Sequence, residues 1–113
     1  MPPPSAPSPL ANLQKLIGTP RDGALLRLSL GLEFSKLNDF PNAIEHLRHA
    51  VELDHGYSAA WRALGKALEA AGDEVAALAA YRDGIAAAQK KGDRQAEKEM
   101  TVFARRLEKK SAA

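Results

Sequence analysis

The sequence predicts an all-α fold, a solenoid built from antiparallel helix pairs. Three observations support this: an apolar content of 45% rich in alanine and leucine, a pattern that recurs after 34 residues, and turn residues midway through each repeat. Alanine and leucine are strong helix formers. A fixed period of this length is typical of solenoids in which each repeat is one helix pair that buries its apolar side by stacking on its neighbours.

The composition excludes several classes of site. The chain has 113 residues, enough for one domain, and no cysteine, so no disulfide, thiolate metal site or cysteine nucleophile is available. Its 16 basic and 14 acidic residues give a net charge of only +2, which does not favour nucleic acid. No apolar run approaches the roughly 18 residues of a membrane helix, and the N-terminus lacks signal-peptide features. We therefore expect a cytoplasmic protein with no membrane or nucleic-acid partner.

The first segment, residues 1–9, is predicted to be a disordered tail. It holds five of the seven prolines, and proline lacks the backbone N–H that a helix interior requires. A helix of about two turns is predicted over 10–18 and is too short to be stable alone, so it must dock on the rest of the domain. Its apolar residues fall at helical spacing: Leu10, Leu13, Leu16 and Ile17.

Two repeats follow, 24–57 and 58–91, and they align without a gap. Each is predicted to contain two antiparallel helices because each has a turn near its middle. Asn38 and Gly72 suit the left-handed backbone at a helix C-terminus, and the aspartate after each can cap the next helix. Ser58 is predicted to cap the first helix of the second repeat.

The segment 93–110 is predicted to be a helix that caps the array, with a tail at 111–113. One of its faces is apolar, and its other faces are charged, as the end of a solenoid must be. Its basic residues alternate with three glutamates, which favours a solvated surface over a nucleic-acid site. The apolar face consists of Ala96, Met100, Phe103 and Leu107.

The repeats resemble the tetratricopeptide repeat, whose signature is W-x2-L-G-x2-Y, then A-x3-F, then a proline. The resemblance covers residues 24–91 and implies a right-handed α-α superhelix of two full repeats plus capping helices. Arg27 and His55 depart from it, at a tryptophan and a proline position. The matching residues are Leu30, Gly31, Phe34, Ala43 and Leu47 in the first repeat, and Trp61, Leu64, Gly65, Leu68, Ala77 and Tyr81 in the second.

These signature residues are expected to be structural. A glycine inside a helix costs ~1 kcal/mol relative to alanine, so Gly31 and Gly65 need a compensating close approach of the paired helix. Ala43 and Ala77 are predicted to be the small residues that face these glycines. Trp61 and the other large apolar residues of the signature then fill the remaining volume.

The resemblance also implies a concave groove, lined by the first helix of each repeat, that binds an extended peptide or a partner helix. Arg62 and Lys66 lie one turn apart, a spacing suited to an acidic side chain or a C-terminal carboxylate. Leu28 and Leu32 stand where chaperone-binding relatives carry a lysine and an asparagine, so binding of chaperone tails is disfavoured. The predicted groove residues are Leu25, Leu28, Leu32 and Lys36 from the first repeat, and Arg62, Lys66 and Glu69 from the second.

Catalysis, cofactors and metals are not expected. The serines, histidines and carboxylates are scattered, and two repeats enclose no cavity in which an acid and a base could converge. Glu45, His46 and His49 lie on adjacent turns, but no fourth ligand is evident, so we expect them to form a polar outer surface instead of a metal site.

The function predicted is therefore that of a protein-interaction module, an adaptor or scaffold for a protein or peptide of unknown identity. The alternative is a structural subunit or homodimer that completes a larger assembly through its leucine-rich face, and either a monomer or a weak homodimer is compatible with the sequence. The outcome depends on whether the helix at 10–18 covers Leu25, Leu28 and Leu32, and we expect that it does. Arg62 and Lys66 equally fit an ordinary solvated helix face.

Overall fold

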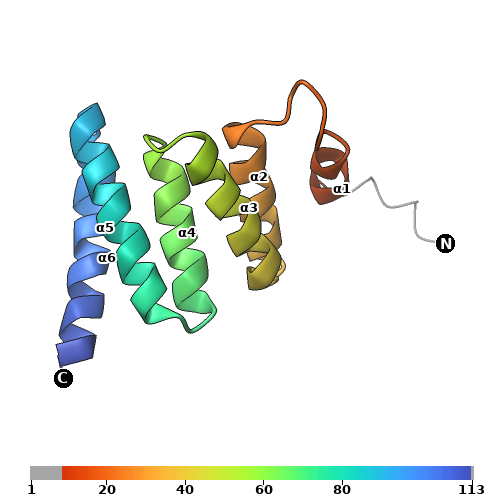
Figure 1. Ribbon diagram of the computed structural model, residues 1–113. Helices are drawn as coiled ribbons and strands as arrows, with labels where there is room; N and C mark the ends of the chain where they lie inside the picture. Colours follow the sequence, from red (N-terminus) through yellow and green to blue (C-terminus); the bar gives the residue numbers. More distant parts are fainter. Residues whose placement is uncertain (1–8, 113) are drawn as a thin grey trace.

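The computed structural model describes residues 9–112, and within this range it contains six α-helices and no strand. Helices α2 and α3 form one antiparallel pair and α4 and α5 form the next, with α1 and α6 at opposite ends of the row (Figure 1). The helices are α1 (Pro9–Gln14), α2 (Ala24–Lys36), α3 (Phe40–Leu53), α4 (Ser58–Ala70), α5 (Glu74–Lys91) and α6 (Arg94–Ala112). The all-α helical solenoid that the sequence predicts is confirmed.

The turns within the repeats have the predicted chemistry. Asn38 and Gly72 have positive φ angles of 58° and 87°. Asp39 then accepts a hydrogen bond from the backbone N–H of Asn42, and Asp73 accepts one from Ala76. Each turn therefore ends one helix and caps the next.

One predicted cap and three predicted boundaries need correction. Ser58 does not cap α4; it is the first residue of the helix, is buried, and donates a hydrogen bond to Asp93 at 2.9 Å. Helix α6 extends through residues 111 and 112, because serine and alanine continue a helix whose last turn carries favourable lysines. Helix α1 begins at Pro9 and ends at Gln14, whereas the sequence predicts a helix over 10–18, and residues 15–18 form turns instead. The rest of the predicted tail, residues 1–8, lies outside the described residues.

The glycines inside the helices are explained by large neighbours. A Cβ placed on Gly31 would overlap the side chain of Leu47, and one on Gly65 would overlap the ring of Tyr81. The sequence predicts Ala43 and Ala77 at these contacts, so the closest neighbours lie one turn further along than expected. Leucine and tyrosine reach across to the opposing backbone, which an alanine side chain is too short to do.

In the first repeat, Arg27 occupies the position that Trp61 holds in the second. Its guanidinium makes two hydrogen bonds to Asp22, at 2.9 and 3.0 Å, and a third contact with Nδ1 of His46 at 3.2 Å. The ring of His46 stacks on Phe34, with centroids 5.5 Å apart. The prediction that His46 belongs to a polar outer surface is wrong, because its ring is half-buried between α2 and α3.

Candidate functional site

A shallow hollow of about 390 Å³ lies where α2, α4 and α6 meet. The apolar part of its lining combines leucines of α2 with alanines of α4, and charged side chains complete it. Helices α2 and α4 occupy corresponding places in the two repeats, so this surface, called the groove below, lies where the resemblance predicts a groove. Its lining residues are Leu28, Leu32, Ala59, Arg62, Ala63, Lys66 and Glu99.

Arg62 does not stand free in this groove. Its Nη1 donates to Oε2 of Glu99 at 2.7 Å, and both side chains are about one-third exposed, with relative exposures of 37% and 34%. Gln95 donates a second hydrogen bond to Glu99. The hydrogen bond from Arg62 is the main reason that the pKa of Glu99 lies below its ordinary value. Half of the predicted basic anchor is therefore already neutralised by α6.

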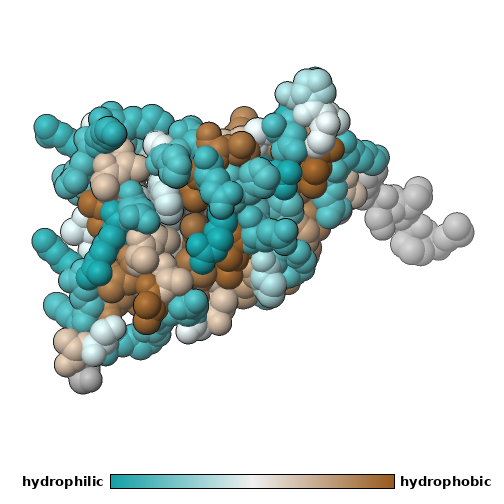
Figure 2. All heavy atoms as spheres, viewed as in Figure 1, coloured by the Kyte–Doolittle hydropathy of each residue, from teal (hydrophilic) through white to brown (hydrophobic). Residues whose placement is uncertain are grey.

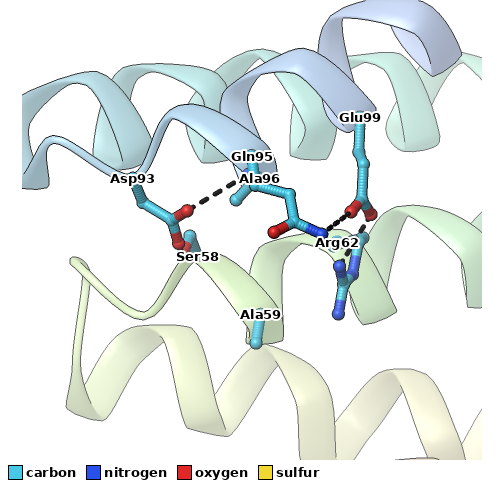
Figure 3. Close-up of a pocket in the computed structure, with 7 residues that line it drawn as sticks. All are labelled: Ser58, Ala59, Arg62, Asp93, Gln95, Ala96 and Glu99. Atoms are coloured by element: carbon cyan, nitrogen blue, oxygen red, sulfur yellow. Dashed lines mark hydrogen bonds and ion pairs between the residues drawn. The ribbon is translucent and has the colours of Figure 1, made fainter.

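A second hollow, of about 240 Å³, continues the groove toward the start of α4 (Figure 3). Both hollows share Ala59, Arg62 and Glu99. In the part of the second hollow that the first does not share, Asp93 accepts hydrogen bonds from the backbone N–H of Ala96 and from the hydroxyl of Ser58. These bonds, in that order, lower the pKa of Asp93. The carboxylates at this end are held by the protein's own donors.

Lys66 is the exposed cation of the groove. Its ammonium lies 5.2 Å from the centroid of the Phe103 ring, an arrangement that attracts a cation to the face of an aromatic ring. No ion pair of Lys66 occurs among residues 9–112. Its charge is therefore available to a ligand.

The predicted groove residue Glu69 joins α4 to α6 and α5. It accepts hydrogen bonds from Arg106, at 2.9 and 3.2 Å, and from the hydroxyl of Tyr81. Burial, followed by the hydrogen bond to Glu69, raises the pKa of Tyr81. Glu69 contributes to the packing of the array and is not part of the hollow's lining.

The first-repeat leucines differ in exposure. Leu25 is 69% exposed and Leu32 is 44% exposed, whereas Leu28 is buried. Helix α1 packs on α2 at the end of the row (Figure 1). Leu25 and Leu32 nevertheless remain exposed. The expectation that the N-terminal helix covers Leu25, Leu28 and Leu32 is therefore wrong for Leu25 and Leu32, because a helix of only six residues is too short to cover the whole apolar surface of α2.

Four of the predicted groove residues come together in the hollow: Leu28, Leu32, Arg62 and Lys66. Leu25 and Lys36 lie outside its lining, and Lys36 pairs with Glu33 at 2.9 Å. The residue that sequence reasoning missed is Glu99. The signal was present, since Glu99 follows Ala96 by three residues and precedes Phe103 by four, which places it at the edge of the predicted apolar face.

Comparison with known proteins identifies the family. Over 100 residues the chain is 47% identical to the TPR repeat-containing protein PA0015 of Pseudomonas aeruginosa, a match that covers 88% of this chain and 95% of that protein. The chain belongs to the tetratricopeptide repeat family. No protein-family model matches this tetratricopeptide repeat chain.

Solved structures show the same tetratricopeptide fold. The solution structure of BPP2914 from Bordetella parapertussis is 39% identical, with a TM-score of 0.81, and the match covers 95% of this chain and 93% of that one. The crystal structure of MamA is 23% identical, with a TM-score of 0.66 over 91% of this chain and 68% of that one. The second match concerns the fold alone.

Family membership supports a protein-interaction module as the general class of function, since tetratricopeptide repeat arrays are typically non-catalytic scaffolds. Among residues 9–112 there is no cluster of three histidines or carboxylates placed to hold a metal ion. Within the same range, none of the helices has the length and apolar character needed to span a bilayer.

Proposed function

We propose that this tetratricopeptide repeat protein is an adaptor that binds a peptide segment or partner protein in the groove between α2, α4 and α6. The observation that carries the proposal is the placement of an uncovered leucine beside an unpaired lysine. Leu32, 44% exposed, and Lys66 line the same hollow. Exposed apolar side chains rimmed by charge are typical of sites that recognise a protein segment.

The chemistry of the groove defines the ligand class. An apolar side chain of the ligand would pack against Leu28 and Leu32, and an acidic side chain or a terminal carboxylate would pair with Lys66. A carboxylate that reaches Arg62 must compete with Glu99, which already accepts its hydrogen bond at 2.7 Å. Lys66 is therefore the principal anchor, and Arg62 contributes only when Glu99 is displaced.

Replacing Lys66 with glutamate tests this proposal. The substitution removes no ion pair, whereas an Arg62 variant would also free Glu99 and loosen α6. The tagged protein should retain a partner in affinity purification that the Lys66→Glu variant loses and the matched Lys90→Glu variant keeps, because Lys90 is exposed on α5, outside the groove lining. Equal recovery of every partner by both variants would exclude Lys66 as the anchor.

A second candidate function is that of a structural subunit or homodimer, and the exposure of Leu25 favours it. This leucine is 69% exposed and lies outside the hollow, where a peptide would not cover it. Sedimentation distinguishes the two functions. A stable dimer that Leu25→Ser converts to monomer supports the structural role, whereas a monomer that captures partners supports the adaptor.

A further inference from the structure

One face of α6 carries positive charge that nothing else in the described structure neutralises. Arg94, Lys98, Arg105 and Lys109 are exposed and make no ion pair within residues 9–112, and Val102, 62% exposed, lies among them. At 3.6 residues per turn, all five residues fall within about 80° around the helix axis and span about 22 Å along it. They form a continuous stripe, which we call the basic stripe.

The glutamates of α6 do not cancel the basic stripe, because each is engaged on another side of the helix. The apolar residues Met100 and Leu107 lie on the opposite side and are buried. The partners of the glutamates come from α4 and α5: Glu97 with Gln89, Glu99 with Arg62, and Glu108 with Arg82.

The basic stripe lies at the uncovered end of the array. Helix α6 packs on α5 and α4, and no described helix packs on its other side (Figure 1). Hydrophilic side chains extend from this end of the molecule (Figure 2). Val102 is therefore left exposed in the middle of four cations.

We propose that the basic stripe docks an acidic helical segment of a partner protein. At each end of the stripe two cations lie one helical turn apart, Arg94 with Lys98 and Arg105 with Lys109. Val102 lies between these two pairs. A helix with acidic residues at the same spacing and an apolar residue at its centre would pair with all four cations and cover Val102, as flanking charges do beside the apolar seam of a coiled coil. This surface is separate from the groove.

Other anionic partners fit the stripe less well. Single-stranded nucleic acid uses aromatic side chains on which bases stack, and the stripe has none. An anionic membrane surface would favour several apolar side chains that insert together, whereas the stripe has only Val102.

The probe for the test is a synthetic helical peptide that carries glutamates at the complementary spacing on both sides of one leucine. Fluorescence anisotropy should show binding to the wild-type protein and at least tenfold weaker binding to the Arg105→Glu/Lys109→Glu variant. The matched control is Arg48→Glu/Lys90→Glu, which changes the net charge equally at exposed, unpaired residues of α3 and α5 and should bind as the wild type does. Circular dichroism confirms that both variants remain helical.

Three outcomes would overturn the proposal. One is equal weakening in the control variant, which would indicate a nonspecific response to net charge. Another is unchanged binding of the peptide by both the Val102→Ser variant and the Arg105→Glu/Lys109→Glu variant. The third is tighter binding of a single-stranded oligonucleotide or of phosphatidylserine vesicles than of the peptide. The Lys66→Glu variant separates the two surfaces, because the glutamates and the leucine of the probe also match the ligand class of the groove. Binding at the basic stripe survives this substitution, whereas binding in the groove does not.

Discussion

Arg62 on α4 and Glu99 on α6 form a 2.7 Å ion pair inside the groove that the two repeats create. Glu99 thereby occupies the place where an acidic ligand of Arg62 would lie. The pair also holds the last helix against the second repeat, together with the Arg106–Glu69 pair. One contact therefore affects both the stability of the array and the charge that a ligand meets.

Removing the charge of Glu99 should strengthen the binding of an acidic peptide in the groove. Glu99→Gln leaves Arg62 without its carboxylate, and exposed ion pairs of this kind contribute about 0.2–1 kcal/mol, so the affinity should rise by a factor of about 1.4 to 5. Isothermal titration with a leucine-containing peptide that ends in a free carboxylate measures this. The control is Glu52→Gln, an equal charge change on α3; an equal gain there would show that only net charge matters.

Adding a methyl group at Gly65 should destabilise the protein. The Cβ of an alanine would overlap the ring of Tyr81, which is fully buried. Such overpacking costs about 1–3 kcal/mol, although alanine is otherwise the better helix former. Urea unfolding of the Gly65→Ala variant measures the loss in the free energy of unfolding. The control is Gly23→Ala, because no atom lies within 4 Å of the added Cβ there. A change below about 1 kcal/mol is expected for this control.

The two kinds of leucine on α2 should respond differently to truncation. Leu28 is 7% exposed and Leu25 is 69% exposed. Leu28→Ala should lower the free energy of unfolding by about 2–5 kcal/mol, because it removes buried methyl groups and leaves a cavity. Leu25→Ala should change it by less than about 0.5 kcal/mol. A large loss in the Leu25 variant would mean that another copy or segment covers this residue in solution.

Acidification should weaken the first repeat through His46. Burial, followed by the charge of Arg27, holds the pKa of His46 below its ordinary value of 6.5. The unfolded chain therefore takes up the proton first, so the free energy of unfolding is at its full value above pH 6.5 and falls as the pH drops through and below that value. The other charged groups that act on the ring are Glu45, His49 and Asp22.

Urea unfolding at about pH 7.5 and about pH 5.5 measures this loss, and the His46→Gln variant should show a smaller one. Asp22 does not interfere. Its pKa is lowered from 3.8, chiefly by the hydrogen bond from Arg27, so its contribution is lost only at more acidic pH. The same pH dependence in the wild type and the variant would exclude His46 as the responsible group.

The periodic part of the fold could be predicted from the sequence because its causes are local. The 34-residue period, the turns at Asn38 and Gly72, and the apolar face of the last helix all depend on spacing along the chain. The place of α1 could not be predicted, since a six-residue helix has too few apolar contacts to determine which face it covers. The sequence therefore left the exposure of Leu25 and Leu32 open.

The parts of the site that the sequence did not predict are contacts between distant side chains. Arg62 and Glu99 are 37 residues apart, and Arg27 meets His46 across 19 residues. Pairings of this kind depend on how the helices are oriented, which the hydrophobic period does not determine.

The most direct test of the adaptor function is site-specific photo-crosslinking in the groove. A photoreactive phenylalanine derivative is introduced at Leu32, which lines the groove, and at Val75 on α5, which is 83% exposed outside it. The adaptor function predicts a crosslinked partner protein at Leu32 that is absent at Val75 and disappears when Lys66 is also replaced with glutamate. Crosslinks of equal yield at both positions, or a Leu32 crosslink that persists in the Lys66→Glu background, would contradict it.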